Sequence, residues 1–150
     1  MDTEAGSRLR GVIAKLSRQL NASAAGEGLT PTEASALAVI AFRGPIGLPD
    51  LTALEGLNPT MVSRIVGKLD DARLIRRVPN ADDLRSANVE VTADGREAND
   101  RIRLERAKVV SESVMQLPDD LQQALIVALP ALEALADQLQ ARRVGRDSVR

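Results

Sequence analysis

The sequence predicts a mainly α-helical fold that includes one small β-hairpin, and three observations support this prediction. Apolar residues recur every three or four positions along most of the 150-residue chain, as they do in amphipathic helices. Two segments in the first half contain a capping residue followed by proline, which is typical of helix starts. One later segment instead alternates apolar and polar residues on both sides of a polar turn, as paired strands do.

The composition excludes several kinds of functional site. The chain has no His, Cys, Trp or Tyr, its only aromatic residue is Phe42, and its formal charge is -1. Without His or Cys there is no Ser-His-Asp triad, thiol nucleophile or zinc cage, so we expect a protein that is not an enzyme and has no metal or cofactor. We also expect a cytoplasmic protein outside the membrane, because no apolar run approaches the ~18 residues of a membrane span and the N-terminus lacks a signal-peptide pattern.

Helical spacing and capping residues locate the first two helices. The first is predicted over roughly residues 6–21 from five apolar residues on one face: Leu9, Val12, Ile13, Leu16 and Leu20. The polar stretch from Asn21 to Gly28 predicts a loop. Thr30 and Glu33 then have the spacing of a capping box, which predicts a second helix that ends at Gly44-Pro45.

A pair of closely spaced helices comes next. A short helix is predicted from Pro49 to about Glu55, and Gly56 suits the position after its C-terminus. Asn58 is a good N-cap for the following helix, which is predicted to run to about Asp71.

The second half of the chain is expected to hold the hairpin and two long helices. Strands are predicted over residues 74–78 and 89–91, with a polar turn over residues 80–86 between them. A long helix is predicted from Thr92 to about Gln116, and a last one carries the leucines from Leu121 to Leu139. Pro130 is expected to kink or split this last helix, and residues 142–150 are expected to be frayed.

The order of short helix, glycine turn, capped helix and hairpin predicts a winged helix-turn-helix, in which the second helix of the pair enters the DNA major groove. From Asn58 to Arg77 there are five basic and two acidic residues, a local charge of +3 in a chain of -1. A solvated helix face beside a solvated strand would show the same polar residues, so only the combination of helix pair, cap and charge favours DNA binding. The candidate recognition-helix residues are Asn58, Thr60, Met61, Ser63, Arg64 and Lys68.

The segment Asp83-x-Arg85-Ser86 resembles the wing motif of the MarR family of transcriptional regulators, and the resemblance extends over roughly residues 29–95. It implies that residues 1–28 form an N-terminal dimerisation helix and loop, that 29–95 form the DNA-binding region, and that 96–150 form the C-terminal dimerisation helices and tail. It also implies that Arg85 probes the minor groove, that Asp83 positions Arg85, and that Lys68 meets phosphate. The candidate residues of the wing and its flank are Arg77, Asp83, Arg85 and Ser86.

The sequence departs from the usual family pattern at four positions. Leu84 stands where the wing usually has a basic residue, Arg73 where glycine usually ends the recognition helix, and Leu48 where a capping Ser or Thr is usual. Asp82 adds a negative charge beside the wing motif.

These features predict a sequence-specific transcriptional regulator, expected to be a repressor that binds double-stranded DNA as a homodimer on a pseudo-palindromic operator. The alternative is a winged-helix module for protein–protein dimerisation with weak or lost DNA binding. Family members often bind small molecules, but the sequence identifies neither an effector nor a site for one.

Overall fold

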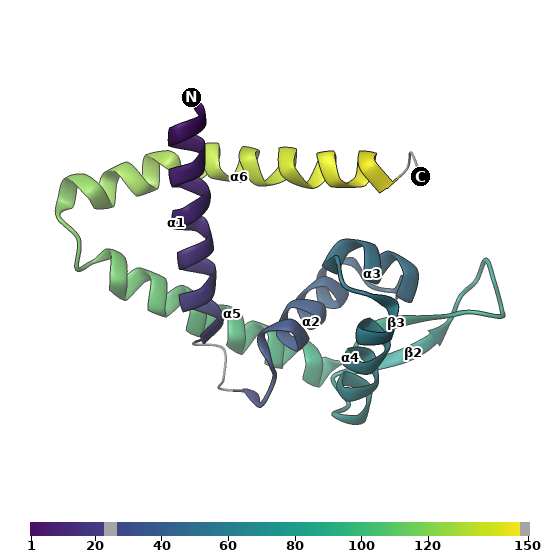
Figure 1. Ribbon diagram of the computed structural model, residues 1–150. Helices are drawn as coiled ribbons and strands as arrows, with labels where there is room; N and C mark the ends of the chain where they lie inside the picture. Colours follow the sequence, from purple (N-terminus) through teal and green to yellow (C-terminus); the bar gives the residue numbers. More distant parts are fainter. Residues whose placement is uncertain (23–26, 148–150) are drawn as a thin grey trace. The chain divides into compact units, whose positions relative to one another are not determined.

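The computed structural model describes residues 1–22 and 27–147, and it confirms a mainly α-helical fold with a small antiparallel sheet (Figure 1). The described elements are α1 (Thr3–Ala22), α2 (Pro31–Arg43), β1 (Ile46–Gly47), α3 (Leu48–Glu55), α4 (Pro59–Asp71), β2 (Ile75–Pro79), β3 (Ala87–Val91), α5 (Ala93–Val114) and α6 (Asp119–Asp147).

Local capping chemistry sets the starts of α2 and α4, as the sequence predicts. The Thr30 side chain accepts a hydrogen bond from the Glu33 N–H at 3.2 Å, and the Glu33 carboxylate accepts one from the Thr30 N–H at 2.9 Å. Asn58 Oδ1 accepts from the Met61 N–H at 2.8 Å. Each bond satisfies a backbone donor that the first turn of a helix leaves without a partner.

The helix α3 lacks such a cap but has a well-formed end. It begins at Leu48 with Gly47 in the N-cap position, and no side chain caps it there. Gly56 has a φ of 65° and ends the helix in the left-handed region, which glycine adopts without a steric penalty. The short connection from Gly56 to Asn58 therefore joins α3 to α4 as the expected helix pair.

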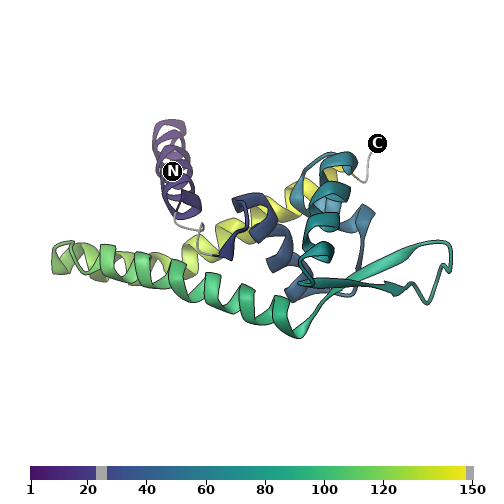
Figure 2. The same ribbon diagram turned by 90° about the horizontal axis from the view of Figure 1, so that it is seen from below.

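The predicted hairpin forms one part of a three-stranded sheet with the order β1-β3-β2. β2 and β3 are antiparallel, with Arg77 opposite Val89. The two-residue strand β1, which the sequence analysis missed, pairs Ile46 with the same Val89. The turn between β2 and β3 extends away from helices α2, α3 and α4 in both views (Figure 1, Figure 2).

The core lies where α2, α3 and α4 pack on each other and on the sheet. Its largest fully buried side chains are all aliphatic, as the composition requires: Leu37, Ile40, Leu51, Leu69, Ile75, Val62, Val66 and Val89. The start of α5 joins this core through Ala98. The core thus holds α4 and the hairpin in one folded region.

The C-terminal part of the chain corrects two expectations. The structure divides into the units Met1–Val109 and Val110–Arg150. Within the second unit, α6 continues through Pro130 without a break, so the predicted split is wrong. Proline removes one backbone hydrogen bond, and the turns on both sides of it in this 29-residue helix stay helical. Residues 142–147 also belong to α6 instead of fraying, and residues 148–150 lie outside the described residues.

α6 has an unusually apolar composition for an exposed helix. Among the described residues it is the one helix long and apolar enough to cross a membrane by length and composition alone, because an 18-residue window within Asp119–Arg142 has a mean hydropathy of 1.3. Such a segment was not expected from the sequence, because polar residues interrupt the apolar ones at Gln122, Gln123, Glu133 and Asp137. None of this window is buried within the chain, so α6 presents a large apolar surface.

Candidate nucleic-acid interface

Helix α4 has one buried aliphatic face and one exposed polar face. Val62, Ile65, Val66 and Leu69 point into the core. Because residues three and four apart share a face, burying these positions leaves the other side of the helix to solvent. The predicted recognition residues are all exposed, Asn58 at the N-cap and the others on that side of the helix: Thr60, Met61, Ser63, Arg64 and Lys68.

Lys68 is held by a carboxylate from another helix. Its Nζ lies 3.0 Å from Oε1 of Glu33, a residue of α2 that is only 6% exposed. The N–H of Thr30 and the ammonium of Lys68 both donate to this carboxylate and lower the pKa of Glu33, although burial opposes the shift. Lys68 therefore neutralises a buried charge, in addition to any contact with phosphate.

Two arginines of β2 are also paired. Arg77 Nε lies 3.5 Å from Oδ2 of Asp70, at the end of α4, and Arg76 forms an ion pair with Glu90 on β3. Arg76 and Glu90 lie directly opposite each other in the strand register. These pairs link the hairpin internally and connect it to α4.

The ion pairs reduce the positive charge that the sequence predicts here. Glu33 and Glu90 lie outside the segment from Asn58 to Arg77, but they pair with Lys68 and Arg76 inside it. Including these two carboxylates lowers the net charge of the cluster from +3 to +1. A count along the sequence could not include them, because the folded chain brings them in from distant positions.

The wing turn, defined as residues 80–86, is organised by its own polar side chains. Asn80 Oδ1 accepts from the Asp82 N–H at 3.0 Å, and Asn80 Nδ2 donates to Ser86 Oγ at 3.2 Å. The Asp83 carbonyl accepts from both the N–H and the hydroxyl of Ser86, at 3.1 and 3.2 Å. Ser86 is therefore a structural part of the turn.

Asp83 positions Arg85 through the backbone. Asp83 Oδ1 accepts from the Arg85 N–H at 3.0 Å, which is the bond of an Asx turn. Within residues 1–22 and 27–147, no ion pair of the Arg85 guanidinium is found, and the residue is exposed. Asp83 thus bonds to the backbone of Arg85 and not to its guanidinium, which stays available for another contact.

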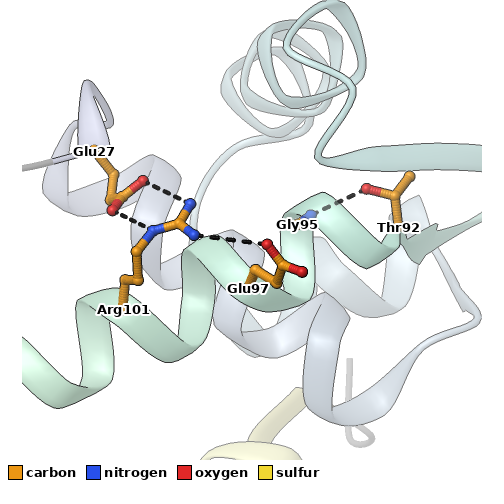
Figure 3. A network of polar contacts seen from close by, with 5 residues as sticks. All are labelled: Glu27, Thr92, Gly95, Glu97 and Arg101. Carbon is orange, nitrogen blue, oxygen red and sulfur yellow. Dashed lines mark hydrogen bonds and ion pairs between the residues drawn. The ribbon is translucent and has the colours of Figure 1, made fainter.

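The end of α4 is fixed to the start of α5 through Thr92. The Thr92 hydroxyl donates to the Arg73 carbonyl at 2.7 Å and accepts from the Gly95 N–H at 3.0 Å, as an N-cap (Figure 3). The Thr92 N–H donates to the Leu74 carbonyl at 3.0 Å. A Cβ on Gly95 would lie 1.8 Å from that carbonyl oxygen, so this close approach requires glycine.

A second contact ties α5 to the segment before α2. Arg101 donates to both carboxylate oxygens of Glu27, at 2.8 and 3.2 Å, and lies 3.8 Å from Glu97 (Figure 3). The hydrogen bond from Arg101 lowers the pKa of Glu27, and Glu27 raises the pKa of Arg101 in return. This pair was not predicted from the sequence, because 74 residues separate its members.

No group of three or more residues able to hold a metal ion occurs in the part of the chain that the structure describes. The features that remain are a capped helix with an exposed polar face and a hairpin that carries an arginine at its turn. Together they define the class of winged helix-turn-helix proteins.

Comparisons with known proteins show what the chain is similar to. Residues 29–87 match the model of the MarR family. The match covers the winged helix-turn-helix region of the chain, and solved structures with the same fold include transcription regulators. Two of the proteins with this fold, Tm0710 and MepR, are described as transcription regulators. A search of curated proteins finds no match.

Several solved structures share the fold over most of the chain. RV1404 from Mycobacterium tuberculosis is 26% identical, with 88% of this chain and 90% of that chain covered and a TM-score of 0.67. The transcriptional regulator Tm0710 from Thermotoga maritima is 19% identical, with 93% and 99% covered and a TM-score of 0.73. A point mutant of MepR from S. aureus, bound to an oligodeoxyribonucleotide, is 15% identical, with 88% and 97% covered and a TM-score of 0.63.

Proposed function

We propose that this protein is a sequence-specific transcriptional repressor that binds a pseudo-palindromic operator as a homodimer. The observation that carries the proposal is the pairing of two exposed features on one folded region: the polar face of α4 and the free guanidinium of Arg85. A helix face of this kind suits the major groove, and an arginine suits the negative potential of a narrow minor groove.

The proposed roles follow from where each side chain lies. The N-terminal residues of α4 and its cap would contact base edges and nearby phosphates: Asn58, Thr60, Met61, Ser63 and Arg64. Arg85 would enter the minor groove, with Asp83 and Ser86 holding the turn that presents it. Lys68 and Arg77 would meet phosphate in a secondary role, because Glu33 and Asp70 already pair with them.

The proposal also includes a second subunit and a location in the cell. A homodimer would place two recognition helices on half-sites about one helical turn apart, roughly 10–10.5 base pairs. We propose a cytoplasmic location for the regulator. The structure offers no basis for naming an effector.

The alternative is a winged-helix module for protein–protein contact with weak or lost DNA binding. The observation in its favour is the reduced charge of the cluster around α4, which falls to +1 once the ion pairs are counted. Phosphate contacts supply much of the affinity of DNA-binding proteins, so a weakly charged surface lowers it.

A binding titration against genomic fragments at two salt concentrations separates the two functions. For the repressor we expect a saturable preferred site whose affinity falls steeply with salt. We expect Arg64→Ala and Arg85→Ala each to weaken binding to that site by about tenfold or more, with little change in melting temperature. Arg43→Ala, which removes the same charge from the end of α2, is the matched control and should bind normally.

Lack of any preferred fragment at low salt would exclude the repressor and favour the protein–protein module. Unchanged affinity of both arginine variants would exclude the assigned contacts even if the protein binds DNA.

A further inference from the structure

Leu84 is the most exposed large apolar side chain of the winged helix-turn-helix region, at 86% exposed. Several leucines on the helices of this region, such as Leu37, Leu51 and Leu69, are completely buried. A leucine that contacts almost nothing in its own chain adds little to folding and is free to contact a partner. What distinguishes Leu84 from other exposed apolar residues, such as Phe42, is its place beside Arg85 in the wing turn.

The wing turn fixes Leu84 at its apex. The hydrogen bond from the Arg85 N–H to Asp83 Oδ1 spans Leu84, and the Ser86 bonds to the Asp83 carbonyl close the turn behind it. Asn80 ties the two ends of the turn together through Ser86. Leu84 is thus presented by an ordered backbone, beside Arg85.

The charge of the apex favours an apolar contact there over an electrostatic one. Asp82 and Asp83 outweigh Arg85, so the apex carries a net charge of -1. A wing tip of this charge gains less from phosphate than a tip with two basic residues would. Burial of an apolar side chain is a source of affinity that does not depend on charge.

We propose that Leu84 is a specificity-determining residue that inserts into the minor groove beside Arg85 as an apolar wedge at a base step. Apolar wedges of this kind partly unstack the step they enter, and leucine is among the residues that serve in this way. Pyrimidine–purine steps unstack most easily, so the wedge favours a step of this kind, such as TA, in the operator flank. This inference rests on the proposed DNA-binding function and adds a base-step preference to it.

The test compares Leu84→Ala, Leu84→Met and wild-type protein on the preferred fragment. We expect Leu84→Ala to lose about five- to tenfold in affinity with no change in salt dependence, because the side chain is neutral. Leu84→Met should retain most of the affinity. Phe42→Ala, which removes a side chain that is 85% exposed on α2, is the matched control and should bind like wild type.

A spectroscopic readout locates the wedge. With 2-aminopurine in the flanking TA step, wild type should raise the fluorescence on binding because the base unstacks, and Leu84→Ala should not. Replacing TA by a GC step should weaken wild type and leave Leu84→Ala almost unaffected.

Two results would overturn the inference while the proposed function stands: equal affinity of wild type and Leu84→Ala, or a change in oligomeric state of Leu84→Ala in sedimentation. If wild type binds no preferred fragment at all, the proposed function fails and the wedge fails with it.

Discussion

Arg73 follows α4 with a φ of 59°, in the left-handed region that side chains with a Cβ rarely adopt. Its backbone is held there from both sides: its N–H donates to the Asp70 carbonyl at 2.8 Å, and its carbonyl accepts from the Thr92 hydroxyl at 2.7 Å. The position where the family usually has glycine thus keeps the glycine conformation with an arginine in it. The surrounding contacts compensate for the strain.

We predict that Arg73→Gly raises the free energy of unfolding by roughly 0.5–1 kcal/mol. Removing the strain of a left-handed residue that carries a Cβ stabilises the folded state by about 1–2 kcal/mol. The greater conformational freedom of glycine in the unfolded chain offsets part of this gain in stability. Urea unfolding measures the difference. Arg73→Ala is the control, because it removes the same side chain and keeps the strain; equal stability of both variants would show that φ is not the cause.

Single-residue chemistry also shows what the sequence could predict. The caps at Thr30 and Asn58 were predicted correctly because their partners lie three residues away along the chain. The ion pair of Lys68 with Glu33 was not, because 35 residues separate the two. Glu33 was identified for its role as a cap, and only the folded chain gives it a second partner.

Among the elements, α2 and α4 are joined by Glu33 as well as by apolar packing. One oxygen of this carboxylate caps α2 and the other pairs with Lys68 on α4. The orientation of the recognition helix therefore depends partly on a buried charge.

We predict that this charge makes stability depend on acid pH. Because folding lowers the pKa of Glu33 from its usual value of 4.5, its contribution is complete above that value and is lost as pH falls through the folded pKa. Glu33→Gln should lower the free energy of unfolding by on the order of 1 kcal/mol at pH 7 and give a shallower loss between neutral and acid pH. Urea unfolding across this range measures both effects.

Lys68→Met is the control for the pH prediction. This variant keeps the hydrogen bond from the Thr30 N–H, which is the largest cause of the lowered pKa of Glu33. Its free energy of unfolding should therefore retain part of the pH dependence. A pH profile of Glu33→Gln that parallels wild type would refute the role of this carboxylate.

The limits of prediction at this scale have physical causes. Helices and the hairpin follow from periodicity and turn residues within short windows. The strand β1 has two residues, too few for a periodic pattern, and exists because β3 offers a free edge at Val89. The continuity of α6 through Pro130 was not predicted, because proline normally ends or kinks a helix. The hydrogen-bonded turns on both sides of Pro130 outweigh the free-energy cost of the one backbone bond that proline removes.

For the molecule as a whole, the buried core and the exposed apolar surface belong to different elements. The core is confined to the winged helix-turn-helix region and the start of α5. In contrast, α1 exposes Val12, Ile13 and Leu16, and α6 exposes most of its leucines. A surface of this extent on one chain indicates a partner.

Two buried polar atoms support the same conclusion. Arg106, a half-buried residue of α5, has its Nε and Nη2 atoms buried without a hydrogen-bond partner among the residues that the structure describes. A buried N–H donor without a partner is costly. An acceptor on a second chain would satisfy these donors.

We predict that the protein is a homodimer whose stability depends on concentration and on the leucines of α6. Sedimentation should show a dimer at micromolar concentration, and the melting temperature should rise with protein concentration. Replacing Leu125 and Leu132, which lie seven residues apart on one face, by Glu should give a monomer and reduce affinity for the full operator far more than for a half-site. Gln123→Glu with Gln138→Glu adds the same charge at exposed polar positions of α6 and should remain dimeric. A leucine variant that sediments like wild type would exclude this face of α6 as the dimer interface. If the wild-type protein is a monomer that pellets with lipid vesicles, the apolar surface of α6 binds a membrane instead.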